Sequence, residues 1–290
     1  MPQMHHPEAL AGLLASIRGQ TIFIHLPSKQ EIMMKGILAR KTLLTSLTAY
    51  KRLLRRKGYG IHSPFVYSIA TKVIAERCPF YCFDEIEQLR GKFLADATRA
   101  PYSSSSRRKR LSTIASIVAH EGIRPRKGEL LFRLVNYLKP ESVLQIGSTV
   151  GFSTLYLSSY RPDVKCVSIE KHAEYAAISS QVYAGVRNSI EHHVGEYEQL
   201  LPPVLDKIQK LDFVFFNTWR EKNNHWLFNS CLPYKGVHSV FVFEGISRNR
   251  DMRNFWKYIC SHPDVTATLD LFTMGIVFFD PNLFKRNYSI

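Results

Sequence analysis

The stretch VLQIGSTVGFS, residues 143–153, reads as a β-strand, a tight turn and the first turn of a helix. Val143 to Ile146 form a short apolar run that predicts a buried strand, and Gly147 and Gly151 bracket the turn. Glycine lets a ligand approach the backbone closely, and the free N–H groups at the start of a helix over 152–160 favour a carboxylate or phosphate. The spacing is Gly-x-x-x-Gly, so the dinucleotide fingerprint and the phosphate-binding P-loop both fit badly.

The sequence after this stretch alternates short apolar runs with helical segments. Further strands are predicted over 165–169, 192–194, 211–216 and 239–243, with helices between them. Strands that alternate with helices of ten or more residues indicate a parallel sheet with helices on both faces. The runs 265–271 and 275–279 leave no room for a helix and predict an antiparallel hairpin. We therefore expect an α/β, Rossmann-like, doubly wound sheet of seven strands.

One acidic residue, Glu170, directly follows the second predicted strand, 19 residues after Gly151. Ligands of such sheets bind at the carboxyl ends of the strands, where the winding reverses. A carboxylate at that position can accept hydrogen bonds from both hydroxyls of a ribose. The alternative is an exposed acid with no role at the end of a strand.

Residues 129–290 resemble the class I S-adenosylmethionine-dependent methyltransferases, in particular the catechol O-methyltransferase-like group. In the first half, the stretch GIHSPFVY, residues 60–67, resembles the leader of a largely uncharacterised bacterial branch of these enzymes. The resemblance implies S-adenosylmethionine as cofactor, with residues 147–153 as the cofactor loop and Ser153 on the methionine carboxylate. It also implies that Glu170 binds the ribose and that residues 194–197 line the adenine.

The cofactor-binding residues that the resemblance implies are Gln145, Gly147, Ser148, Thr149, Gly151, Ser153, Glu170, Gly195, Glu196, Tyr197 and Asn217. Five positions depart from the pattern of the group: 145, 217, 220, 244 and 245. Gln145 replaces an acid, Asn217 replaces an aspartate, and Glu244-Gly245 replaces an Asp-Asn pair. The group binds a divalent ion through the last two sites, so only one of two expected carboxylates remains here. A divalent metal is therefore doubtful, and we predict no metal ligands.

The catalytic candidates are Glu244, Asn217 and Arg220. Arg220 stands where the group has a lysine or histidine base, but a guanidinium stays protonated and cannot accept a proton. Arg220 is expected to pair with an anionic substrate or with Glu244. Glu244 is the best single candidate for a general base, and it would need burial to raise its pKa. A structural carboxylate at the end of a strand is the alternative.

The resulting prediction is O-methyl transfer from S-adenosylmethionine to a small or medium acceptor, with weak or no dependence on metal. Methyl transfer from a sulfonium is an in-line displacement, so alignment of donor and acceptor is the main requirement. A catalytically degenerate binding protein is one alternative, suggested by the changes at 145, 217, 220 and 245. An RNA methyltransferase is a less favoured alternative, suggested by the basic first half.

The charge of the 290-residue chain is concentrated in its first half. Residues 1–127 hold 22 Lys and Arg against 8 Asp and Glu, whereas residues 128–290 hold 17 against 16. The densest basic runs are 51–57 and 107–110. We predict a poorly defined extension over 1–32, a basic helical region over 33–127 that forms a lid or a dimer surface, and a methyltransferase domain over 128–290. Steps of three and four between Leu43, Leu47, Tyr50 and Leu54 predict one helix of that region.

No run of 18 apolar residues occurs, and the first eight residues lack the pattern of a secretory signal. Five scattered cysteines give no disulfide framework. We therefore expect a cytoplasmic protein that acts on a small molecule. A homodimer is left open, and nucleic acid is a partner that the sequence permits but does not favour.

Overall fold

The computed structural model describes residues 13–17, 20–24, 60–98, 113–186 and 189–290, and the chain divides into two compact units, Met1–Lys51 and Arg52–Ile290. In the first unit, strands β1 (Leu13–Ile17) and β2 (Gln20–Ile24) pair antiparallel. The helix predicted over 43–54 and both basic runs lie outside the described residues.

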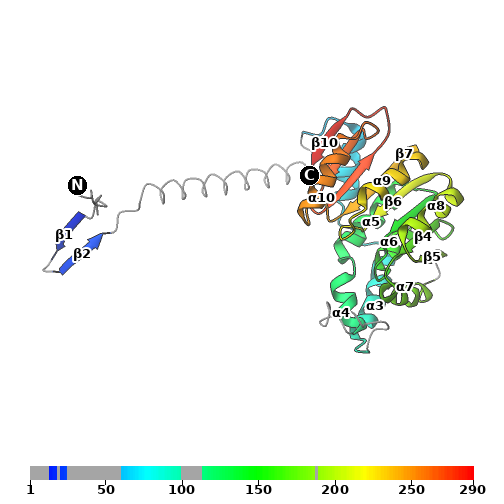
Figure 1. Ribbon diagram of the computed structural model, residues 1–290, viewed down its shortest axis with the longest axis horizontal. Coiled ribbons are helices and arrows are strands. Elements are labelled where there is room, and N and C mark those ends of the chain that lie inside the picture. Colours follow the sequence, from blue (N-terminus) through cyan, green and yellow to red (C-terminus); the bar gives the residue numbers. More distant parts are fainter. Residues whose placement is uncertain (1–12, 18–19, 25–59, 99–112, 187–188) are drawn as a thin grey trace, which may run out of the picture. The chain divides into compact units, whose positions relative to one another are not determined.

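The second unit is built on an eight-stranded sheet with helices on both faces (Figure 1). Its strands are β3 (Ser142–Ile146), β4 (Lys165–Glu170), β5 (Ile190–Val194), β6 (Leu211–Phe216), β7 (Lys235–Glu244), β8 (Ala267–Asp270), β9 (Met274–Phe278) and β10 (Arg286–Ser289). Its helices are α2 (Pro64–Ile69), the π-helical turn η1 (Ala70–Ile74), α3 (Tyr81–Ala95), α4 (Ile114–Glu121), α5 (Pro125–Leu138), α6 (Phe152–Ser158), α7 (Ala173–Ala184), α8 (Tyr197–Ile208), α9 (Asn224–Cys231), the 3₁₀ turn η3 (Leu232–Tyr234) and α10 (Arg250–Ser261).

The strand order is β10-β8-β9-β7-β6-β3-β4-β5. Strands β3 to β7 run parallel, and β9 is antiparallel to both β7 and β8. The predicted Rossmann-like sheet and its antiparallel hairpin are thus confirmed. One strand more than predicted is present, because the polar segment β10 pairs parallel with β8 at the sheet edge. The winding reverses between β3 and its neighbour β6, which opens a crevice at their carboxyl ends.

Alternate residues of each strand feed two separate hydrophobic cores. Val143 of β3 belongs to the core under α2 to α7, whereas Leu144 and Ile146 belong to the core under α8 to α10. The first core also contains Val66 of α2 and Ile117 of α4. The domain boundary that we predict at residue 127 stays a prediction. In the structure, one hydrophobic core contains residues from both sides of this position.

The stretch GIHSPFVY, residues 60–67, contains the N-cap of helix α2. Ser63 is the N-cap of α2 and accepts a hydrogen bond from the N–H of Val66, and Pro64 occupies the first turn. The motif therefore supports local structure, and it places Val66 in the core.

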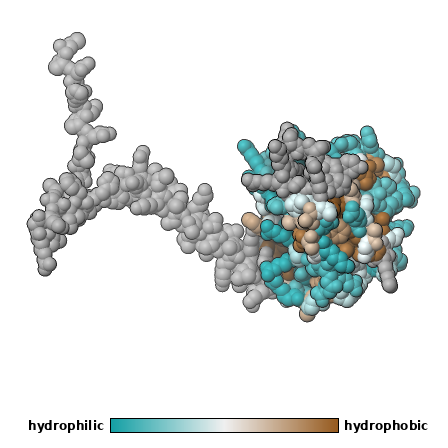
Figure 2. Space-filling model, turned by 90° about the horizontal axis from the view of Figure 1, so that it is seen from below, coloured by the Kyte–Doolittle hydropathy of each residue, from teal (hydrophilic) through white to brown (hydrophobic). Residues whose placement is uncertain are grey.

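The surface of this unit mixes polarities. Figure 2 shows hydrophilic residues and apolar patches interspersed on one face. The large apolar side chains that remain exposed come from different elements, for example Tyr67 of α2 and Tyr81 of α3. Among the described residues, no helix is both long enough and apolar enough to cross a membrane.

Close packing of α5 on α6 depends on Gly128. A Cβ at this position would lie 2.3 Å from the ring of Tyr156, which is fully buried. We expect Gly128→Ala to lower the free energy of unfolding by about 1–3 kcal/mol, because Tyr156 has to move. Gly91, in the middle of α3, has nothing within 4 Å of such a Cβ. Gly91→Ala is therefore the matched control, and it should raise stability by about 0.5–1 kcal/mol in the same urea titration. Equal effects of the two substitutions would contradict the packing seen here.

Candidate active site

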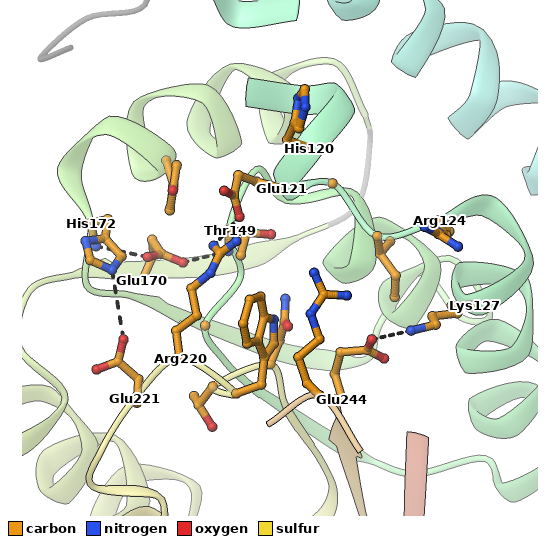
Figure 3. A pocket seen from close by; sticks show the side chains of 18 of the residues that line it. His120, Glu121, Arg124, Lys127, Thr149, Glu170, His172, Arg220, Glu221 and Glu244 are labelled. Atoms are coloured by element: carbon orange, nitrogen blue, oxygen red, sulfur yellow. Dashed lines mark hydrogen bonds and ion pairs between the residues drawn. The ribbon is translucent and has the colours of Figure 1, made fainter. Parts of the chain in front are cut away.

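A pocket of about 500 Å³ opens at the carboxyl ends of β3, β4, β6 and β7 (Figure 3). We call it the strand-end pocket. One side is formed by the segment from α4 to the first turn of α5. The lining residues are Ala119, His120, Glu121, Gly122, Ile123, Arg124, Lys127, Gly147, Thr149, Glu170, His172, Tyr175, Tyr197, Asn217, Thr218, Trp219, Arg220, Glu221, Glu244, Arg248 and Thr273.

The turn after β3 requires glycine at position 147. Gly147 has φ +79°, and a Cβ there would lie 2.7 Å from the carbonyl oxygen of Asn217. Thr149, two residues later, has φ +50°, which is rare for a β-branched residue. Its backbone N–H is thereby directed to the carboxylate of Glu170, at 2.6 Å. The turn is held in an uncommon conformation where a ligand would lie.

Glu170 fastens this turn to β4. Its side chain is 1% exposed, and its second oxygen accepts the N–H of His172 at 2.9 Å. Burial raises the pKa of Glu170 to about 7, although the N–H groups of His172 and Thr149 oppose the rise. A buried strand-end carboxylate that lines a pocket is poised to accept hydrogen bonds from a ligand's hydroxyls.

Gln145 and Ser153 lie behind the turn and do not line the pocket. The Gln145 amide donates to Ser153 Oγ at 2.6 Å and accepts from Thr154 Oγ1 at 3.0 Å, and all three side chains are buried. The amide that replaces an acid therefore satisfies a buried hydrogen-bond network. Of the predicted cofactor residues, Gly147, Thr149, Glu170, Tyr197 and Asn217 line the pocket. Cofactor contact by Gln145, Ser148, Gly151, Ser153, Gly195 and Glu196 stays a prediction.

Glu244, at the end of β7, forms an ion pair with Lys127 of α5 (Figure 3). Lys127 contacts Oε1, whereas Oε2 is buried and has no hydrogen-bond partner among the described residues. Burial raises the pKa of Glu244, and the positive charges of Lys127, Arg248 and Arg124 oppose that rise. An unpartnered carboxylate oxygen beside a pocket can accept a proton from a bound molecule.

One alternative from the sequence paired Arg220 with Glu244. That alternative is wrong, because Arg220 pairs with another residue. Its guanidinium pairs with Glu121, at the end of α4, and lies 4.2 Å from the ring centre of Trp219 (Figure 3). Neither Glu121 nor Lys127 is predicted as a site residue from the sequence. Their approach depends on how α4 and α5 pack against the strand ends, and no local motif signals it.

The residues at the expected metal position do not fit a divalent cation. Glu244 is already paired with an ammonium group, and Asn217 offers only an amide. Gly245 has no side chain, and a Cβ there would lie 2.8 Å from Cβ of Trp219, so a ligand at 245 requires Trp219 to move. Within the described ranges, no three His, Cys, Asp or Glu side chains gather as metal ligands would. No step is therefore assigned to a metal.

Comparisons with known proteins point to one family. The model of the O-methyltransferase family matches residues 103–238. Catechol O-methyltransferase B of Danio rerio is 30% identical over 100 residues, which cover 33% of this chain and 38% of that protein. Catechol O-methyltransferase of Mycobacterium tuberculosis is 34% identical over 106 residues, which cover 33% of this chain and 44% of that protein. The chain thus spans less than half the length of these curated relatives.

A solved structure supports the fold over a longer range. The O-methyltransferase from Bacillus cereus, crystallised with S-adenosylhomocysteine (SAH), superposes with a TM-score of 0.52 at 17% identity. The superposition covers 73% of this chain and 96% of that one. At this identity the likeness concerns the fold alone.

Proposed function

We propose that this chain is a member of the O-methyltransferase family, in the catechol O-methyltransferase-like group of the class I S-adenosylmethionine-dependent methyltransferases. In this proposal it methylates a hydroxyl oxygen without a divalent metal. The observation that carries the proposal is the strand-end pocket itself. It joins Glu170 and the Gly147 turn on one side to Glu244, with its unpartnered oxygen, on the other.

The described residues fit S-adenosylmethionine as the methyl donor. Glu170 can accept its ribose hydroxyls, and Gly147, which also lines the pocket, lets the turn after β3 approach the Asn217 carbonyl, where a Cβ would collide. Tyr175, Tyr197 and His172 supply flat side chains for the adenine side of the pocket. S-adenosylmethionine supplies an electrophilic methyl group on a sulfonium, so the protein has to align the acceptor and remove its proton.

Glu244 is the general base of this proposal. Oε2 would take the proton of the acceptor hydroxyl while the acceptor oxygen bonds to the methyl carbon; the bond from that carbon to the sulfonium sulfur would break, its electron pair would stay on sulfur, and SAH would leave. Burial raises the pKa of Glu244, which brings it nearer to neutral pH and makes it a better proton acceptor than an ordinary carboxylate. Lys127 holds Oε1 and so fixes the orientation of the carboxylate. Arg220 is bound to Glu121 and takes no part in proton transfer.

Four of the departures from the group pattern, at 145, 217, 220 and 245, have a place in an intact site in the structure. Gln145 completes a buried hydrogen-bond network, and Gly245 makes room for Trp219. Arg220 has an acidic partner, and Asn217 lines the pocket. These compensations favour an active enzyme over a degenerate binding protein. The RNA alternative gains no support, because the basic runs behind it lie outside the described residues.

The test is methyl transfer from radiolabelled S-adenosylmethionine to a panel of hydroxyl-bearing small molecules in EDTA. We expect turnover of at least one acceptor, at a rate that added Mg²⁺ changes by less than about twofold. Turnover that EDTA abolishes would contradict metal independence. Tight SAH binding without turnover of any acceptor would restore the degenerate alternative.

Binding of SAH should weaken as the pH falls, because the ionised form of Glu170 is the better acceptor for two hydroxyls. With a pKa of about 7, Glu170 is mostly ionised at pH 8 and mostly protonated at pH 6. We expect the Kd for SAH to rise about tenfold between pH 8 and pH 6, because only about a tenth of Glu170 stays in the binding, ionised form at pH 6. Calorimetric titrations at both pH values check this. In Glu170→Gln the change should shrink below twofold, and an unchanged pH dependence there would assign it to another group.

We also propose the cytoplasm as the compartment. All five cysteines are free, and burial raises the pKa of the Cys166 thiol to about 12. Unpaired, poorly ionised thiols suit a reducing environment. Cell fractionation with an antibody against the chain tests this, and recovery from a membrane or extracellular fraction would contradict it.

A further inference from the structure

The half of the strand-end pocket around Glu244 holds more positive than negative charge. Three cationic side chains, Lys127, Arg124 and Arg248, act on the Glu244 carboxylate. We call these four residues the Glu244 cluster. All four line the pocket. One carboxylate neutralises one of the three cations, so two positive charges remain.

The two remaining cations are Arg124 and Arg248. Lys127 is paired with Glu244, and the neighbouring Arg220 is paired with Glu121. Within the part of the chain that the structure describes, neither Arg124 nor Arg248 has an ion pair with an acidic side chain. Both line the pocket and are exposed, so they can contact a molecule that enters it.

Arg248 is held in place more firmly than an ordinary surface arginine. Its backbone N–H donates to the carbonyl of Gly245 at 2.8 Å, which closes a turn directly after β7. Its guanidinium lies 4.7 Å from the ring centre of Trp219. Trp219 in turn packs against the backbone of Gly245, where a side chain has no room. Arg248 is thereby fixed beside Glu244, and its donors are left for a ligand.

We propose that the methyl acceptor carries an anionic group, a carboxylate or a phosphate, which Arg124 and Arg248 bind beside the proton-accepting oxygen of Glu244. This inference rests on the proposed function and specifies its substrate class. Guanidinium groups bind both kinds of anion through paired N–H donors. The same positive field stabilises the negative charge that develops on the acceptor oxygen as it loses its proton.

The experiment compares probes that share an aromatic ring and differ in charge. Catechol is neutral, 3,4-dihydroxybenzoate carries a carboxylate, and phenyl phosphate carries a phosphate. Each is titrated into the full chain by calorimetry, with and without saturating SAH. We expect at least one anionic probe to bind about tenfold or more tightly than catechol, and the tighter of the two identifies the anion.

Substitutions show whether Arg124 and Arg248 are responsible for the preference for anionic probes. The double variant Arg124→Gln/Arg248→Gln should lose the preference for anions, while its affinity for SAH changes by less than about twofold. Lys257→Gln removes one exposed positive charge on α10 outside the pocket and should retain the preference. Thermal unfolding confirms that both variants are folded.

Two results would overturn the inference: catechol that binds as tightly as both anions, or an anion preference that survives in the double variant. Its failure is separable from failure of the proposed function. A chain that binds SAH but shows no anion preference contradicts only the acceptor class. A chain that prefers anions but never binds SAH contradicts the methyltransferase instead.

Discussion

Glu244→Gln is expected to lower kcat for methyl transfer by about 10²–10⁴, the usual contribution of a general base. The amide keeps the shape of the side chain but cannot take a proton from the acceptor hydroxyl. The affinity for SAH should change by less than about twofold, because the substitution acts on the acceptor side of the pocket. Steady-state kinetics on an acceptor that turns over, together with SAH titration, measure both quantities.

Two further variants separate loss of the general base from other effects of the substitution. Glu244→Gln leaves the Lys127 ammonium without its partner, so the double variant Lys127→Met/Glu244→Gln removes that unpaired charge and should be equally inactive. Glu141→Gln changes an exposed carboxylate directly before the first residue of β3, at the end of the strand opposite to the pocket, and should retain full activity. If Glu244→Gln kept more than about a tenth of the wild-type kcat, Glu244 would not be the base.

Gly147→Ala is expected to abolish the stabilisation of the protein by SAH. The new Cβ would meet the Asn217 carbonyl at 2.7 Å in a backbone conformation, φ +79°, that suits glycine. At a ligand concentration about a hundredfold above Kd, SAH should stabilise the wild type by about 2.7 kcal/mol. For a domain of this size, that raises Tm by about 5–10 °C. In Gly147→Ala we expect a shift below about 1 °C.

Gly91→Ala again serves as the control, since it adds the same methyl group where nothing lies within 4 Å. It should keep the full SAH-induced shift. Gly147→Ala itself is expected to be less stable than the wild type by about 1–3 kcal/mol in the absence of ligand. A Gly147→Ala protein with the wild-type shift would show that SAH binds away from the turn after β3.

Periodicity predicted most of the sheet because its buried strands are short and largely apolar, as in Leu211–Phe216 of β6, where Asp212 is the one polar residue. The edge strand β10 escaped prediction because its sequence, Arg286–Ser289, is mostly polar and short. Helix α10 (Arg250–Ser261) was not assigned either, although Met252, Phe255 and Ile259 recur at helical spacing on its buried side. In the latter case the signal was present in the sequence.

The site residues likewise include some that the sequence could predict and some that it could not. Gly147 and Glu170 could be found from the sequence because the turn after β3 and the end of β4 are adjacent by the logic of a parallel sheet. Lys127 could not, because its contact with Glu244 joins residues 117 positions apart through the packing of α5. The role of Gln145 also needed the structure, since only the positions of Ser153 and Thr154 show that the amide is satisfied.

The central claim is that the strand-end pocket binds S-adenosylmethionine without the help of a metal. Calorimetric titration of the full chain with SAH in EDTA tests it most directly. We predict saturable binding of one SAH per chain, with a Kd that added Mg²⁺ changes by less than about twofold. The absence of saturable heat at two temperatures, from a protein shown to be folded, would contradict the claim.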